Sequence, residues 1–318
     1  MNGSAARVRK PFVGPCPVLY HGEDVRIAWS HARRDLVALQ PPSIEVHGWM
    51  HNRSEAVIAA IRREMPHTAI ALGPGLDPVA TNWRSHRDGD RAVAAVLNIA
   101  RAADAAGLDA LVVDPETSWK GRNPTEHAAL SCIAVEVVET IARELPGMPL
   151  YVTTFSSPVN VRGWGGHRAF PWGGWLRPSL SRYVSQVYFP GPMGLRALAA
   201  LSRESFDDAV KLGVIPPGVE RFIELQLHHN HAEAIVAVAL DAVRSEHDVV
   251  QLWAPGTGEL CDAKGLEAMR VLVRAWHAGV WREGAVNALQ ELVGVKVDGN
   301  YGPETHSAVL RWMRPVSV

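Results

Sequence analysis

The chain has 318 residues, of which 47% are hydrophobic, and its formal net charge is -1. This composition supports one large domain, or a large and a small one, and lacks the basic excess that nucleic-acid binding demands. No apolar run reaches the roughly 20 residues that a membrane-spanning helix needs, so we expect neither a nucleic-acid partner nor membrane insertion.

The N-terminal segment and the cysteines indicate where the protein is made. Gly14 and several prolines interrupt the apolar part of the first 24 residues, so the segment does not have the pattern of a signal peptide. Cys16, Cys132 and Cys261 are odd in number and have no CxxC spacing, which argues against a disulfide framework or a structural zinc site. We therefore expect synthesis in a reducing cytoplasm.

Short β-rich runs alternate along the chain with longer runs of helical periodicity. The predicted strands are 16–21, 43–49, 67–73, 108–114, 149–155, 182–189, 221–228 and 248–253. The predicted helices are 28–39, 53–64, 88–106, 124–144, 194–212, 230–245 and 263–278. Eight strands with intervening helices predict an α/β fold, the (β/α)8 TIM barrel, over residues 1–280. An open doubly wound sheet is the alternative, but the Gly-rich fingerprint after its first strand is missing.

Several predicted strands carry polar side chains on one face. Strand 221–228 places Glu224, Gln226 and His228 together, because alternate residues of a strand share a face. These polar faces would line the barrel interior, where each group needs a partner. For the deeper residues Glu45, Glu224 and Gln251, a satisfied internal hydrogen-bond network is as good an interpretation as a functional site.

Active sites of such barrels lie at the C-terminal ends of the strands. Two long loops, 73–89 and 156–179, follow strands there and contain tryptophans. These tryptophans line a cleft for an extended ligand, or they form a small core under the loop. The candidates for substrate binding are Trp119, Gln226, His228, Trp49, Trp253, Trp83 and Trp164.

From about residue 284 the sequence changes to two short helical runs around a turn-rich loop. The segment resembles the second half of the three-helix peptidoglycan-binding domain, whose pattern runs LQ…LG…VDGxxGxxTxxAVxxFQ. The matching residues are Leu289-Gln290, Val293-Gly294, Val297-Asp298-Gly299, Gly302, Thr305 and Ala308-Val309. The first helix of that domain is not evident here. The resemblance implies a small α-helical wall-binding unit over 284–318, with Asp298, Tyr301, Thr305 and Trp312 as candidate contacts.

Two acids end the fourth predicted strand in the stretch "LVVDPET". Asp114 and Glu116 are two residues apart, which puts their side chains on one side, with Cβ atoms about 6–7 Å apart. Like charges so close raise one pKa, so one acid can donate a proton while the other stays ionised. Hydrolysis of a glycosidic bond uses such a pair of carboxyl groups.

The same stretch is similar to the strand-four Asp-x-Glu motif of the glycoside hydrolase family 25 lysozymes. On this resemblance Glu116 is the proton donor and Asp114 is the partner carboxylate or nucleophile. The pattern also resembles chitinase-type barrels, in which a tyrosine on strand six, here Tyr188, orients an acetamido group. The sequence departs from the lysozymes at strand one, where only Glu23 or Asp24 could replace their aspartate.

These observations favour a peptidoglycan glycoside hydrolase, a lysozyme-like endolysin that uses no cofactor and no metal. Without a signal peptide, it would reach the cell wall after lysis, through a membrane pore or by an injection machine. A zinc-dependent amidase is the first alternative, because His47, His51, His228, His229 and His231 could supply metal ligands. A non-catalytic wall-binding protein is the second.

Overall fold

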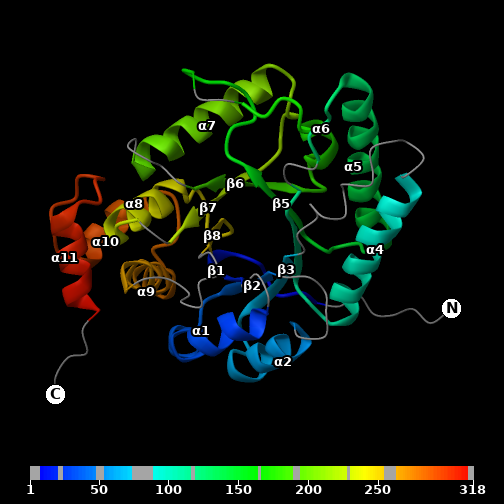
Figure 1. Cartoon of the computed structure of the whole chain (residues 1–318). Coiled ribbons are helices and arrows are strands. Elements are labelled where there is room, and N and C mark those ends of the chain that lie inside the picture. The colour runs from blue at the N-terminus through cyan, green and yellow to red at the C-terminus, as the bar shows by residue number, and fades with distance from the viewer. Residues whose placement is uncertain are drawn as a thin grey trace.

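Eight parallel strands form a closed barrel in the computed structural model (Figure 1), which describes residues 8–20, 24–47, 54–73, 89–115, 119–163, 166–188, 194–227, 230–253 and 263–313. Each strand pairs with the next in sequence, and β1 closes the barrel by pairing with β8. The strands are β1 (Gly14–Tyr20), β2 (Ser43–His47), β3 (Ala69–Gly73), β4 (Ala110–Val113), β5 (Leu150–Phe155), β6 (Arg182–Val187), β7 (Arg221–Gln226) and β8 (Val249–Trp253). The predicted (β/α)8 fold is confirmed.

Helices surround the barrel on its outside (Figure 1). They are α1 (Val25–Leu39), α2 (Ser54–Glu64), α4 (Gly89–Ala105), α5 (Pro124–Glu144), α6 (Trp172–Trp175), α7 (Leu195–Lys211), α8 (Ala232–Ala242), α9 (Ala263–His277), α10 (Ala285–Val293) and α11 (Pro303–Trp312). Among the described helices, none combines the length and apolar character required to cross a membrane.

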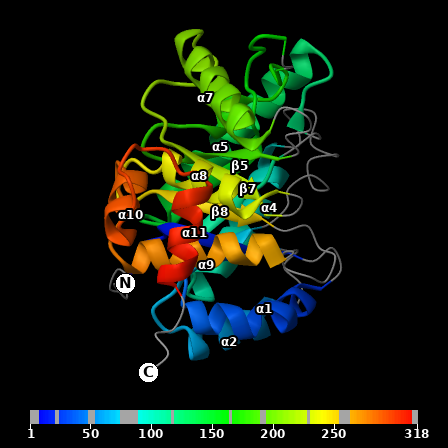
Figure 2. The same cartoon turned by 90° about the vertical axis from the view of Figure 1, so that its left-hand side faces the viewer.

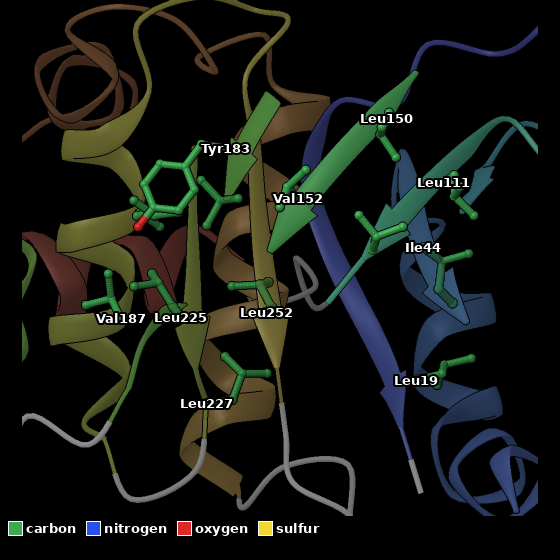
Figure 3. Packing of buried hydrophobic residues seen from close by; sticks show 14 of the residues in the cluster. Leu19, Ile44, Leu111, Leu150, Val152, Tyr183, Val187, Leu225, Leu227 and Leu252 are labelled. Atoms are coloured by element: carbon green, nitrogen blue, oxygen red, sulfur yellow. The ribbon is translucent and has the colours of Figure 1, made fainter. Parts of the chain in front are cut away.

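The two faces of each strand pack against different partners. Outward-facing Leu111, Leu225 and Leu252 are fully buried in the layer between strands and helices (Figure 3). Inward-facing residues, among them Cys16 and Val112, form a separate small cluster inside the barrel. Burial of a leucine contributes roughly 1.5–3 kcal/mol, so alternation along each strand fixes which face meets the helices.

The N-terminal end of the barrel is closed by packing. Tyr151 projects into it and packs against Phe12, with ring centroids 5.1 Å apart, and its hydroxyl donates to the Phe12 carbonyl. Asp109 accepts from the backbone N–H groups of Lys10 and Ile70, which ties the N-terminal segment across β3 and β4. The polar interior residues therefore have their approach from the C-terminal end of the strands.

Three described tryptophans that follow the fourth and fifth strands, Trp119, Trp172 and Trp175, form a core rather than a surface. Trp119 and Trp175 are fully buried and meet edge to face at 4.7 Å, and Trp172 is also buried. Helix α6 contains Trp172 and Trp175 and directs both rings inward. Sequence periodicity does not predict this helix, because two of its four residues are glycines. A Cβ at Gly174 would lie 2.7 Å from the Ser131 carbonyl oxygen, so glycine permits α6 to approach α5 this closely.

Helices α10 and α11 pack on the barrel and share its outer hydrophobic cluster. Helix α11 lies across α9 (Figure 2), where His306 Nε2 hydrogen-bonds the Glu267 carboxylate at 2.9 Å. The ring's other nitrogen bonds the Tyr301 hydroxyl at 2.9 Å. On α7, Arg196 donates to the Asn300 side chain and to the Tyr301 carbonyl. The C-terminal helices are therefore attached to the barrel by polar contacts as well as by apolar packing.

One buried glutamine holds the loop between α10 and α11. The Gln290 amide nitrogen donates to Asp298 Oδ1 at 2.9 Å, to Thr305 Oγ1 at 3.1 Å and to the Asn300 carbonyl at 3.2 Å. Its oxygen accepts from the backbone N–H groups of Asp298 and Gly299, both at 3.1 Å. The Gln290 side chain thus hydrogen-bonds residues from several positions of the turn-rich loop and fixes the path of the loop.

We expect Gln290→Ala to lower the free energy of unfolding by about 1–3 kcal/mol, because it leaves several polar groups without their partner. Urea denaturation of the whole chain, followed by tryptophan fluorescence, measures the change. The matched control is Glu291→Ala, since Glu291 is the exposed neighbour on the same helix. Equal stabilities for the two variants would contradict a role for this network.

Candidate active site

Polar and aromatic side chains converge at the C-terminal end of the barrel. They come from successive strands because all parallel strands end on the same side. The residues are Tyr20, Glu45, His47, Asp114, Thr153, Gln186, Tyr188, Glu224, Gln226, Gln251 and Trp253. This group is the candidate site.

Glu224 of β7 is the most deeply placed acid with a perturbed pKa. Its side chain is buried, with 3% of the residue exposed, and it accepts from Thr153 Oγ1 at 2.6 Å and from the Tyr188 hydroxyl. Burial, followed by the nearby Glu45 carboxylate, raises the pKa of Glu224 to about 7, although the two hydrogen bonds oppose the shift. A carboxyl group with this pKa can both accept and donate a proton near neutral pH.

Glu45 of β2 is buried beside Glu224 and has its own partners. Its two carboxylate oxygens bond His47 Nδ1 at 2.8 Å and Gln251 Nε2 at 2.7 Å. Gly73 lies next in the sheet, and a Cβ there would come within 2.0 Å of Glu45 Oε1. The absence of a side chain at Gly73 therefore makes room for the carboxylate and the imidazole.

Tyr188 and two other aromatic residues line the mouth of the barrel. The Tyr188 ring stacks on Trp253 at 4.7 Å with an interplanar angle of 15°, and Tyr20 packs edge-on against His47 at 5.3 Å. Burial, together with the Glu224, Asp114 and Glu45 carboxylates, raises the pKa of Tyr188 well above its usual value. Tyr188 is thus a protonated hydroxyl donor at neutral pH.

Asp114 follows β4 at the barrel mouth and is partly exposed. Gln186 Nε2 of β6 donates to Asp114 Oδ1 at 3.2 Å, which joins the ends of two strands that are not neighbours in the sheet. The Thr154 hydroxyl donates to the Pro115 carbonyl at 2.7 Å and so fixes the backbone just after the aspartate. These contacts determine the direction in which the chain leaves β4.

The structure brings some of the residues singled out from the sequence together and separates others. Asp114, Tyr188, Gln226 and Trp253 lie at the same end of the barrel, although Gln226 has only 1% of its surface exposed. The expectation that Trp119 contacts substrate needs correction, because its ring belongs to the core next to Trp175. The remaining candidates lie outside the described residues: Glu116, His228, Trp49, Trp83 and Trp164.

The candidate wall-binding residues also differ in exposure. Tyr301 and Thr305 are buried and hold the α10–α11 unit together, so their surfaces are not available to a glycan. Asp298 and Trp312 are exposed. Asp298 and Thr305, together with seven other residues, line a hollow of about 190 Å³ beside the loop.

Two further expectations concern Asp24 and the histidines. Asp24 caps the first turn of α1 by accepting from the Arg26 backbone and pairs with its guanidinium at 2.7 Å, which is a structural role. Within the described ranges, no three His, Cys, Asp or Glu side chains are grouped so that they could hold a metal ion. His47 is bonded to Glu45, and His231 is the N-cap residue of α8. His51, His228 and His229 lie outside the described residues.

Sequence reasoning left several contributors to the site unassigned. Alternation placed Glu45 and Glu224 on the polar faces, but it could not show that they lie near each other across the barrel. Tyr20 and Thr153 were not considered, although each lies on the inner face of its strand. The period of two could have found both residues, because Thr153 is two residues beyond the inward-facing Tyr151 and Tyr20 is four residues beyond the inward-facing Cys16.

Comparisons with known proteins agree on the fold. No protein-family model and no curated protein sequence matches the chain. The β-mannanase of the blue mussel Mytilus edulis superposes with a TM-score of 0.50 and 10% identity, over 81% of this chain and 91% of the mannanase. A class V chitinase from Pseudomonas fluorescens Pf-5 superposes with a TM-score of 0.50 and 9% identity, over 81% of this chain and 98% of the chitinase. A GH5-4 endoglucanase from Clostridium longisporum superposes with a TM-score of 0.50 and 9% identity, over 85% of this chain and 97% of the endoglucanase.

These comparisons show that the chain shares the (β/α)8 fold with the three structures. At such low identities the likeness concerns the path of the backbone. The chemistry has to be argued from the side chains at the barrel mouth.

Proposed function

We propose that the protein is a glycoside hydrolase that cleaves the glycan strands of bacterial peptidoglycan, as a lysozyme-like endolysin. The observation that supports this most is the convergence of carboxyl groups at the barrel mouth. Asp114 is partly exposed, whereas Glu224 has a pKa near 7 and is hydrogen-bonded to Tyr188. Acids with different environments at one site are what general acid–base cleavage of a glycosidic bond requires.

In this proposal Glu116 protonates the leaving oxygen, and Asp114 stabilises the positive charge that develops at the anomeric carbon. The acid would follow Asp114 by two residues, on the stretch whose backbone Thr154 anchors at Pro115. Gln186 orients Asp114 by donating to its Oδ1 at 3.2 Å, which holds the carboxylate at the barrel mouth. An acetamido group of the substrate can supply the nucleophile instead, and then Asp114 would polarise that group.

Tyr188 and Trp253 act as binding groups in this scheme. Their stacked rings present apolar surface next to the acids, and ring faces of this kind pack against the C–H faces of sugars. The Tyr188 hydroxyl, which donates to Glu224, keeps that carboxyl oriented. Because the pKa of Glu224 is about 7, it can return a proton to the site during turnover.

The C-terminal helices favour peptidoglycan over other glycans. Their motif resembles a peptidoglycan-binding domain, and the hollow of about 190 Å³ beside Asp298 is polar. Binding to the wall through this unit would raise the effective concentration of glycan at the barrel. We infer that the protein meets its substrate after lysis, through a pore or by injection.

The test is digestion of purified peptidoglycan by the full chain, with mass spectrometry of the soluble products. We expect muropeptides with new reducing ends, whose terminal sugar identifies the bond that is cut. Free stem peptides without new reducing ends would overturn the proposal, since they are the products of an amidase. Soluble products at the level of a no-enzyme blank would overturn it as well and would favour a wall-binding protein without activity.

A further inference from the structure

Residues of α7, α8 and the first turn of α10 line a cavity on the outside of the barrel. Figure 1 shows where these three helices lie. Its volume is about 580 Å³, within the range of small-molecule sites. An adjoining hollow of about 260 Å³ shares Arg203, Arg221 and Arg244 with it. Both hollows lie at the N-terminal end of β7, whereas the candidate active site lies at the C-terminal end of the strands.

Four arginines line the large cavity: Arg196, Arg203, Arg221 and Arg244. None of the four forms an ion pair with a carboxylate of the described residues. Elsewhere in the described chain, arginines regularly do so, as in Arg270 with Asp35 at 2.9 Å. Asp241, which lines the same cavity, attracts Arg196, Arg203 and Arg244 without forming an ion pair with any of them. One carboxylate offsets only part of the repulsion among the arginines, so a bound anion would stabilise the cluster.

The hydrogen bonds of these arginines go to neutral oxygens. Arg244 Nη1 donates to the Asp241 and Val243 carbonyls, and Arg196 donates to the C-terminal loop. Arg221 Nη2 donates to Ser202 Oγ at 2.9 Å, while its buried Nε has no hydrogen-bond partner among the described residues. A buried guanidinium without a counter-ion carries a desolvation cost that a bound anion would offset.

Arg221 keeps its charge in this position. Burial, and to a lesser extent Arg203 alongside, lowers the pKa of Arg221 to about 10. The guanidinium is therefore still protonated at neutral pH. It lies where the two hollows meet, since it lines both.

The first turn of α10 contributes a second, independent attraction for an anion. Its residues 284–287 line the same cavity. No side chain caps this helix, its N-cap is Gly284 with φ of 74°, and no acid occupies the first turn. The first N–H groups of the helix and the positive end of its dipole therefore face the cavity, with no acid of the helix's own first turn to offset them.

The charge and the lining of the cavity define the ligand. Against the four arginines, the wall of the large cavity contains two carboxylates, Asp241 and Glu283, which leaves two positive charges in excess there. Asp207 and Asp248 line only the adjoining hollow. A phosphate monoester carries close to two negative charges at pH 7 and accepts paired hydrogen bonds from guanidinium groups. The rest of the wall is largely apolar, with Ala199, Ile223, Val238, Leu240 and Val286.

We propose that this cavity binds a small organic phosphate, with the phosphate held by Arg203, Arg221 and the first turn of α10 and the carbon skeleton against the apolar wall. The site is separate from the glycan site, and its existence does not depend on the proposed function. Because α10 belongs to the C-terminal unit and Arg221 to the barrel, a bound ligand would join the two.

The test is isothermal titration calorimetry of the full chain with glycerol 2-phosphate at constant ionic strength. We expect saturable binding, which Arg203→Gln and Arg221→Gln each weaken about tenfold or more, since each removes a charge-assisted hydrogen bond. The matched control Arg274→Gln removes an exposed arginine from α9, and its binding should equal that of the wild type. Circular dichroism checks that each variant folds. Because Arg203 is exposed, its variant remains decisive when Arg221→Gln is unstable.

Three outcomes would overturn the proposal. One is the absence of saturable binding of glycerol 2-phosphate to the wild type. Another is unchanged binding in the folded Arg203 variant. The third is equally tight binding of succinate, which would show a site for any dianion rather than for phosphate.

Discussion

Replacement of Glu116 by glutamine is expected to lower the rate of glycan cleavage by about 10²–10⁴-fold, the contribution of a positioned general acid. Glutamine keeps the length and shape of the side chain but cannot deliver a proton to the leaving oxygen. The measurement is the initial rate at which new reducing ends form from purified peptidoglycan. Binding to the wall should be unchanged, because the substitution is outside the C-terminal unit.

Glu246→Gln is the matched control for this experiment. Glu246 follows α8 and its side chain is 77% exposed, so its replacement makes the same change in charge away from the barrel mouth. We expect the control to cleave at the wild-type rate. Full activity in the Glu116 variant would exclude it as the acid and would direct attention to Glu224, whose pKa already suits proton transfer.

The second large effect concerns pH and stability. Glu224 has a pKa of about 7 in the folded protein and an ordinary value of 4.5. Between these values the unfolded chain has lost this proton while the folded chain still holds it. The folded state binds more protons, so the free energy of unfolding falls as pH rises through this window, by about 3 kcal/mol from this residue. The contribution is fully present below pH 4.5 and lost above pH 7.

Glu224→Gln should therefore flatten the dependence of stability on pH between 4.5 and 7. Glutamine does not titrate, and it can still accept from Thr153 and Tyr188. Urea denaturation at half-unit pH steps measures the slope for both proteins. An unchanged slope would mean that burial does not hold the proton on Glu224 in the folded state.

The fold could be predicted from the sequence because the strands alternate so clearly. Each predicted strand overlaps a strand of the barrel, and every gap between consecutive strands except the one after β5 contains a helix of at least 11 residues. Successive residues of a strand point to opposite faces, and in a closed barrel both faces are buried. The face toward the helices is therefore apolar, whereas the face toward the barrel interior mixes apolar and polar residues. Helix α6 escaped prediction because its stability comes from the burial of two tryptophans rather than from local propensity.

The site could be predicted only in part. The rule that strands end on one side placed Asp114, Tyr188 and Trp253 together, and the structure agrees. It failed for Trp119, because a residue five positions beyond a strand can turn back under the loop as easily as outward. The proximity of Glu45 and Glu224 depends on closure of the barrel, because four strands separate β2 from β7 along the chain, and no local pattern encodes it.

The pairing of β1 with β8 has a consequence for how the chain folds. These strands join residues such as Cys16 and Gln251. Until the ribosome has released the segment around residue 253, β1 has an unpaired edge, and β7 keeps one as well. Contacts of such long sequence separation slow folding, and open strand edges recruit other chains. The nascent protein must therefore pass most of its synthesis with two exposed edges, a period in which chaperones would be of greatest use.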